Sequence, residues 1–168
     1  VQKRAGVNII LAFKGFAMWS VFPLVRNYLK GATASSLHEA RLCFEEMKSK
    51  AHAYCVAYNP SEFDELASIS SYLTFNSMKQ WDTFKCRIPL GVSCGLRVNP
   101  EWSDVDTDLY NPASPSSRLG ITAKSLGSKL PEGIDGLHFH VLCESNSYAL
   151  EKVLERLELK FSNHLSKV

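Results

Sequence analysis

Short apolar runs alternate along this chain with segments in which apolar side chains recur every three or four positions. A short run of β-branched and other apolar residues, bounded by turn-forming residues, is typical of a buried strand, whereas the wider spacing is typical of a helix. The pattern predicts six strands, at residues 9–13, 32–35, 51–57, 72–76, 91–98 and 136–142. It predicts helices after these strands, at residues 20–30, 37–49, 60–70, 78–86, 122–128 and 147–161.

Turn and cap residues support several of these boundaries. Pro23 falls in the first turn of its predicted helix, where proline is tolerated, and Gly31 follows the helix end. Ser36 with Glu39 three residues later forms the capping-box pattern that opens a helix. Ser77 is a plausible N-cap for the helix that follows it.

Regular alternation of strands and helices predicts an α/β fold with parallel strands and right-handed crossovers. Two architectures meet this description: a doubly wound open sheet and a (β/α)8 barrel of the TIM type. The first strand is not followed by G-x-G-x-x-G, so the open dinucleotide-binding fold lacks its main signature. A barrel needs eight units and typically ~250 residues, so about six β/α units predict a partial barrel.

Composition narrows the function classes. The 168 residues are 45% apolar and 21% charged, typical of one globular domain. The net charge of +2 is made of scattered groups with no basic stripe, so we expect no nucleic-acid partner. Apolar runs stay far short of the ~20 residues of a membrane span. Five separated cysteines without a C-x-x-C pair favour neither a zinc knuckle nor a redox motif, and they fit a reducing cytoplasm.

Lys14 is the first candidate for chemistry. The run 9–13 delivers this lysine to the carboxyl end of a predicted buried strand, where Gly15 turns the chain. Ligands of α/β folds bind at the carboxyl ends of the strands. The alternative is a lysine that extends into solvent along an apolar surface.

Two further candidates end other strands. Arg97 closes the fifth predicted strand, where it would either face an anionic group or form a salt bridge at the rim. The sixth carries His138 and His140, which face the same side at a strand spacing of two. This pair could chelate a transition metal, or His138 could pack in the core below a ligand-contacting His140. In a barrel, Lys14, Arg97 and His140 would converge on one mouth.

The connection at residues 99–119 is long for a segment without predicted structure, and such loops are often functional. Its acids Asp104, Asp106 and Asp108 resemble the start of a calcium loop. The glycine and terminal glutamate of that motif are missing, so solvated loop acids are the simpler interpretation.

Six motifs in order carry a resemblance to a known family. They are FKGFAMWSVFP, GATASSLHEARL, LTFNSMKQW, SCGLRVNPEWS, DLYNPASPSSRLG and LPEGIDGLHFHVLCESNS. Together they resemble carboxynorspermidine (carboxyspermidine) decarboxylase, a barrel-type pyridoxal-phosphate-dependent decarboxylase related to the ornithine and diaminopimelate enzymes. The resemblance covers essentially the whole chain. It implies a (β/α)8 barrel followed by a β-sandwich domain, in a cytoplasmic homodimer about twice this length.

The resemblance also implies roles for single residues. Lys14 matches the lysine that attaches pyridoxal 5'-phosphate, and His140 matches the histidine that stacks on the cofactor ring. Arg97 and Glu39 match, less specifically, an arginine and an acid near the cofactor. Thr33 stands where the ornithine enzymes have an aspartate, so that acid role does not carry over.

Within the chain, Arg118 also matches a basic position near the subunit interface. Other family features are expected outside residues 1–168. The first strand and last two strands of the barrel, the β-sandwich, the phosphate loop, the acid that pairs with the pyridine nitrogen and the partner's cysteine loop would all lie outside the chain. We therefore expect residues 1–168 alone to be inactive, with no metal site.

The expected reaction is decarboxylation of a small polyamine substrate, carboxynorspermidine or carboxyspermidine, in polyamine biosynthesis. The resemblance implies that the Lys14 amine is the group that reacts with the cofactor. Two alternatives remain: a non-catalytic, regulatory paralogue that binds the same cofactor, and a metal-dependent barrel hydrolase using His138 and His140.

Overall fold

A computed structural model describes residues 1–166 and residue 168. The chain forms two compact units. The first contains Val1–Thr74 and Phe84–Ser93, and the second contains Phe75–Thr83 and Cys94–Val168. The six strands predicted from the pattern are all present, and every pairing within a unit is parallel.

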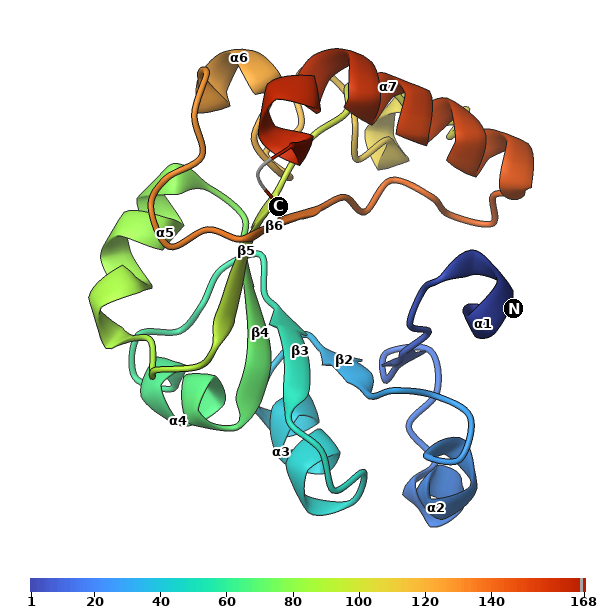
Figure 1. Ribbon diagram of the computed structural model, residues 1–168, viewed down its shortest axis with the longest axis vertical. Helices are drawn as coiled ribbons and strands as arrows, with labels where there is room; N and C mark the ends of the chain where they lie inside the picture. Colours follow the sequence, from blue (N-terminus) through green and yellow to red (C-terminus); the bar gives the residue numbers. More distant parts are fainter. Residues whose placement is uncertain (167) are drawn as a thin grey trace. The chain divides into compact units, whose positions relative to one another are not determined.

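The first unit is built on strands that pair in chain order (Figure 1). These strands are β1 (Leu11–Ala12), β2 (Ala32–Ala34), β3 (Ala51–Tyr54) and β4 (Ser70–Phe75), of which the last residue falls in the second unit. The helical segments are α1 (Gln2–Ala5), η1 (Trp19–Val21), α2 (Phe22–Val25), α3 (Leu37–Glu45), α4 (Phe63–Ser68) and η2 (Lys85–Arg87).

Small side chains let α3 approach β2 and β3 closely. Ala32 and Ala34 of β2 and Ala51 and Ala53 of β3 are almost fully buried, and α3 contacts both strands. Intervening residues such as His52 are only partly buried, as the two-residue period of a strand requires. One face of the sheet is therefore covered by helices, and the other carries the larger polar side chains.

The predicted capping box is confirmed, with one difference. The Ser36 hydroxyl accepts a hydrogen bond from the Glu39 amide at 3.2 Å. The Glu39 carboxylate accepts from the amide and hydroxyl of Ser35, at 2.6 and 2.8 Å, one residue before the cap. Both contacts fix the chain where β2 enters α3.

The predicted helix at residues 20–30 is wrong in length. Only α2 and the short η1 form, and Pro23 does occupy the first turn of α2. Phe22 is the only buried residue of α2, and Leu24, which was expected on the inner face, is 59% exposed. A helix without a packed apolar face is marginal. Because α2 ends at Val25, Gly31 does not cap it. The Gly31 carbonyl instead accepts a hydrogen bond from the Leu11 amide at 2.9 Å and joins β1 to β2.

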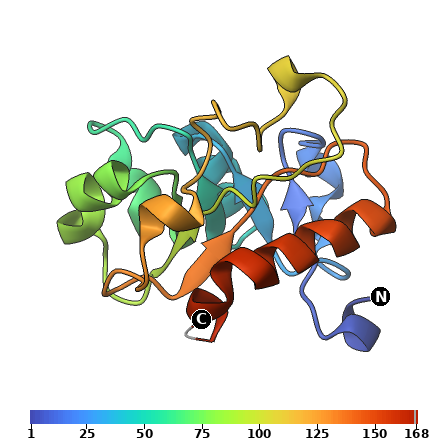
Figure 2. The same ribbon diagram turned by 90° about the horizontal axis from the view of Figure 1, so that it is seen from above.

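The second unit pairs two strands and covers them with one long helix (Figure 2). Its elements are β5 (Ser93–Arg97, with Ser93 in the first unit), β6 (Gly136–His138), α5 (Met78–Phe84, ending in the first unit), η3 (Asp108–Tyr110), α6 (Ala123–Leu126) and α7 (Ser147–Leu165). The α7 residues Val153, Leu157 and Phe161 form an apolar cluster with Val98 and Val141, which follow the two strands.

Two boundaries in this unit differ from the predictions by four residues each. The sixth strand ends at His138 rather than at residue 142, so the chain from Phe139 onward has no strand partner. The final helix continues past residue 161 to Leu165, with non-helical backbone angles at Phe161. The Phe161 ring is nonetheless fully buried, so core packing holds the helix together across this irregular residue.

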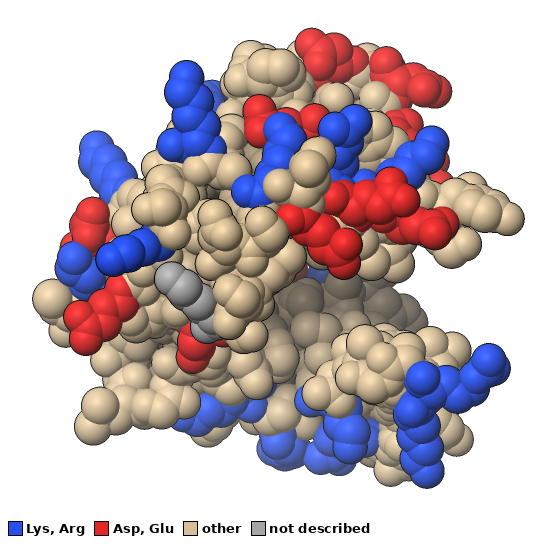
Figure 3. Space-filling view, turned by 45° about the horizontal axis from the view of Figure 1, so that its top comes forward, with Lys and Arg blue, Asp and Glu red and all other residues tan. Residues whose placement is uncertain are grey.

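Charged side chains of both signs are mixed over the upper half of the view in Figure 3. Within the described part of the chain, no helix combines the length and the apolar character that crossing a bilayer requires.

Candidate active site

Lys14 lies in a tight turn at the carboxyl end of β1. The amides of Gly15 and Phe16 both donate to the Ala12 carbonyl, at 3.0 and 3.1 Å. Phe13, which is 3% exposed, stacks on Phe22 with ring centroids 5.1 Å apart and anchors the turn from below. The Lys14 side chain is exposed above this anchor. An amine is thus presented at the strand edge where ligands of parallel sheets bind.

Glu39 occupies the third position of α3, and its carboxylate is hydrogen-bonded to Ser35. The same carboxylate favours the positive end of the α3 dipole. Glu39 therefore stabilises the start of α3 in the first unit, whether or not it also contacts a ligand.

Arg97 and His140 meet in the second unit. Arg97 is the last residue of β5, is only 4% exposed, and donates from Nη2 to the His140 carbonyl at 3.0 Å. Its backbone carbonyl accepts from the Ile121 amide at 2.8 Å. The guanidinium is therefore buried beneath the segment that carries His140 rather than exposed at a rim, while the His140 side chain is exposed.

The His138 and His140 rings lie close together, with centroids 6.0 Å apart, although β6 itself ends at His138. Burial, together with smaller contributions from the neighbouring His140 and Arg97, lowers the pKa of His138 to about 4. Among the described residues, no three His, Cys, Asp or Glu side chains group in a way that could hold a metal ion.

The lowered pKa of His138 predicts acid sensitivity. The unfolded chain takes up a proton near pH 6.5, whereas the folded chain resists protonation until about pH 4. The free energy of unfolding should therefore fall as pH drops through this window, by up to about 3 kcal/mol at ~1.4 kcal/mol per pH unit. Urea titrations between pH 7 and 5 should show this slope in the wild type and a flatter one in His138→Phe. Equal slopes would contradict the assignment.

Asn76 is a residue of this unit that the sequence pattern did not single out. It is 7% exposed, donates from Nδ2 to the Arg118 carbonyl at 2.9 Å, and accepts on Oδ1 from the Gly120 amide at 3.0 Å. The contacts hold residues 118–120 near Arg97, since the Ile121 amide binds the Arg97 carbonyl. The available sequence signal was an amide side chain at the carboxyl end of the strand predicted at residues 72–76.

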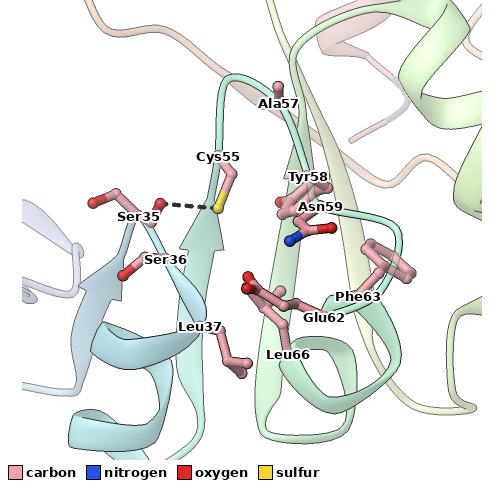
Figure 4. A pocket seen from close by; sticks show the side chains of 10 residues that line it. All are labelled: Ser35, Ser36, Leu37, Cys55, Ala57, Tyr58, Asn59, Glu62, Phe63 and Leu66. Atoms are coloured by element: carbon pink, nitrogen blue, oxygen red, sulfur yellow. Dashed lines mark hydrogen bonds between the residues drawn. The ribbon is translucent and has the colours of Figure 1, made fainter.

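A pocket of about 130 Å³ lies beyond the carboxyl ends of β2 and β3 in the first unit (Figure 4). It is lined by Ser35, Ser36, Leu37, Cys55, Ala57, Tyr58, Asn59, Glu62, Phe63 and Leu66. The Cys55 thiol donates to the Ser35 carbonyl at 3.0 Å, as drawn in Figure 4. None of Lys14, Glu39, Arg97 and His140 is among the lining residues, although the Glu39 carboxylate accepts hydrogen bonds from Ser35, which does line the pocket.

The five cysteines differ in burial. Cys43, Cys55 and Cys94 are buried, whereas Cys86 and Cys143 are exposed. Burial raises the pKa of Cys55 to about 12 and of Cys94 to about 11, and it also raises the pKa of Cys43. The buried thiols therefore stay protonated at neutral pH.

The four predicted site residues thus fall into two pairs. Lys14 and Glu39 belong to the first unit, and Arg97 and His140 belong to the second. All four lie at or just beyond the carboxyl end of a strand, or in the first turn of the helix that follows it. This is the edge that carries the active site in folds of alternating parallel strands and helices.

Comparison with solved structures defines the class of fold. The chain superposes with a TM-score of 0.87 and 39% identity on carboxynorspermidine decarboxylase from Campylobacter jejuni, crystallised with norspermidine, covering 97% of this chain and 41% of that one. It superposes with a TM-score of 0.76 and 14% identity on diaminopimelate decarboxylase from Helicobacter pylori, covering 96% of this chain and 45% of that one. The predicted class is confirmed: an α/β fold whose six parallel strands match the barrel portion of these structures.

Sequence comparison finds related decarboxylases over the whole length of this chain. The chain is 44% identical to carboxyaminopropylagmatine decarboxylase of Synechocystis and 40% identical to carboxynorspermidine/carboxyspermidine decarboxylase of Campylobacter jejuni. Both alignments cover all of this chain and 44% of the relative. No family model matches the sequence. The resemblance is confirmed: the chain is homologous to the carboxynorspermidine/carboxyspermidine decarboxylases and spans less than half the length of these relatives.

Proposed function

We propose that the chain is the lysine-bearing barrel part of a cytoplasmic, pyridoxal-phosphate-dependent decarboxylase that makes norspermidine or spermidine from its carboxylated precursor. The observation that carries the proposal is the match over the whole chain at 40% identity to a relative of that name, with Lys14 exposed at a strand end. The active form would be a homodimer, as the resemblance of the motifs to this family implies. Residues beyond this chain would hold the cofactor phosphate and supply the β-sandwich domain.

The side chains present fit pyridoxal phosphate. An exposed primary amine suits the cofactor aldehyde, and an exposed imidazole suits the face of a planar ring. Arg97 fits less as a direct ligand, because its guanidinium is buried and bonded to the His140 carbonyl. We propose that Lys14 and His140 contact the cofactor and that Arg97 and Glu39 hold the adjoining backbone.

Pyridoxal phosphate, when bound, supplies an electron sink for the electron pair that remains when the α-carboxylate leaves. The chain's own residues set the geometry of that step. Lys14 would hold the cofactor through its amine. His140 would contact a face of the cofactor ring. The packed Phe13–Phe22 pair below Lys14 keeps water from the base of this turn.

A second substrate class is favoured by one observation. The Synechocystis relative, 44% identical, is named for carboxyaminopropylagmatine, which carries a guanidinium in place of a terminal amine. The reacting end of both substrate classes is the same. The two proposals therefore share Lys14 and His140. They differ only in the protein residues that bind the end of the substrate away from the reacting carbon.

The test is an assay of the full gene product loaded with pyridoxal phosphate. Carbon dioxide release should be measured with carboxynorspermidine, carboxyspermidine and carboxyaminopropylagmatine, with ornithine and diaminopimelate as controls. Preference for either of the first two supports the leading proposal, and preference for the third supports the agmatine-type substrate. Cofactor binding without carbon dioxide release would instead favour a regulatory paralogue. Stoichiometric zinc with hydrolysis would favour the metal-dependent alternative.

A further inference from the structure

The segment that carries His140 has no regular secondary structure of its own. After β6 ends at His138, residues 139–146 run without helix or strand until α7 begins at Ser147. Glu144 within it has a positive φ of 54°. Backbone outside a ladder keeps one position only where other groups bind it. The groups that bind this segment therefore determine where the His140 ring is held.

Two neighbouring residues of the connection after β5 bind this segment at both ends. The Ser103 hydroxyl donates to the Val141 carbonyl at 2.8 Å. The Ser145 hydroxyl donates to Asp104 Oδ1 at 2.7 Å, and it also accepts from the Cys143 amide at 3.1 Å. The bond to Asp104 is charge-assisted, which makes it stronger than a bond between neutral groups.

The connection itself is anchored, so it can act as a support. Asn99 and Pro100 are almost completely buried just before it, and the Asn99 amide donates to the Ile121 carbonyl at 2.9 Å. Trp102 packs against the apolar cluster that contains Val141 and the buried face of α7. Ser103 and Asp104 therefore project from a fixed stretch of backbone toward the His140 segment.

We infer that Ser103, Asp104 and Ser145 are positioning residues for His140. Arg97 holds the His140 carbonyl from below, Ser103 holds the next carbonyl, and the Asp104–Ser145 pair closes the far end of the segment. The consequence for a planar cofactor rests on the proposed function: the imidazole meets the ring in one fixed orientation. Asp104, one of three loop acids in the sequence, therefore has a hydrogen-bond partner in Ser145 and a positioning role that Asp106 does not share.

The first experiment needs no cofactor. Amide hydrogen exchange of the cofactor-free full gene product should be measured on peptides covering residues 139–146. We expect exchange there to be about two- to tenfold faster in Asp104→Ala and Ser145→Ala, the range that one lost hydrogen bond represents. Asp104→Asn keeps an acceptor and should restore most of the protection, and the exposed Asp106→Ala is the matched control. Unchanged exchange in both alanine variants, or an equal increase in the control, would overturn the inference.

The second experiment measures the dissociation constant of pyridoxal phosphate by its absorbance. Asp104→Ala and Ser145→Ala should each raise the constant about two- to tenfold. The double variant should be no worse than Ser145→Ala, because that variant already removes the Asp104–Ser145 bond along with the Cys143 contact. An altered absorbance maximum of the bound cofactor in these variants, and not in Asp106→Ala, would mark a displaced ring contact rather than general loosening. Additive losses, or unchanged binding in both single variants, would overturn the inference. Failure of the wild-type protein to bind the cofactor would refute the proposed function. It would not affect the inference about Ser103, Asp104 and Ser145, because the exchange experiment tests that inference without the cofactor.

Discussion

Gly120→Ala should destabilise the second unit by about 3 to 5 kcal/mol, which is large for one added methyl group. Gly120 has a φ of +86°, which costs an L residue about 1 to 2 kcal/mol. A Cβ there would also stand 2.9 Å from the Val98 carbonyl carbon and 3.1 Å from the Asn99 nitrogen. Both are backbone atoms directly after β5, so they cannot move away by a side-chain rotation. Chemical denaturation followed by circular dichroism would measure the loss.

Gly91→Ala is the matched control for this variant. Gly91 has nearly the same φ, +84°, but its Cβ would have no atom within 4 Å. We therefore expect only the backbone cost of about 1 to 2 kcal/mol there. Equal destabilisation by the two substitutions would show that the close approach of Gly120 to β5 contributes nothing.

Lys14→Ala in the full gene product should lower the rate of decarboxylation by about three orders of magnitude or more, as loss of a covalent-catalysis residue does elsewhere. Lys14 is an exposed residue of a surface turn, so its removal should change stability by about 1 kcal/mol at most. Borohydride treatment of the loaded wild-type protein should fix the cofactor on the peptide that contains Lys14. Mass spectrometry would locate that label.

Lys30→Ala provides the comparison for Lys14. Lys30 is another exposed lysine of the first unit, and it is held by its backbone amide, which donates to the Ile9 carbonyl at 3.0 Å. Its substitution should preserve both the label and the activity. Labelling that persists in Lys14→Ala, or that moves to Lys30, would refute the assignment of Lys14.

The strands and the residues at their ends were predictable because their signals are local. A β-branched run ending in a lysine specifies a strand end, and the Ser36–Glu39 pair specifies a helix start, without reference to the rest of the chain. Lys14 and Arg97 accordingly lie where the pattern predicted, and His140 lies just beyond its strand. Their roles toward a cofactor came from the motifs rather than from the spacing, and they stay predictions.

Features that depend on distant segments were not predictable in this way. The sixth strand ends at His138 because the backbone beyond it binds Arg97 and Ser103, which lie 43 and 38 residues earlier in the chain. The helix expected at residues 20–30 shortens because most of its apolar face has nothing to pack against in its unit. Asn76 was missed because its partners, Arg118 and Gly120, lie more than 40 residues later. Each depends on a tertiary contact that no short window contains.

The uneven burial of the cysteines gives the protein two natural attachment points for probes. Thiolates are the reactive form of cysteine, and the three buried thiols stay protonated, so maleimide or nitroxide reagents should reach Cys86 and Cys143 first. Cys86 belongs to the first unit and Cys143 to the second. A pair of spin labels on the unmodified sequence would therefore report the distance between the two units in solution, with Cys143 at the same time marking the segment next to His140.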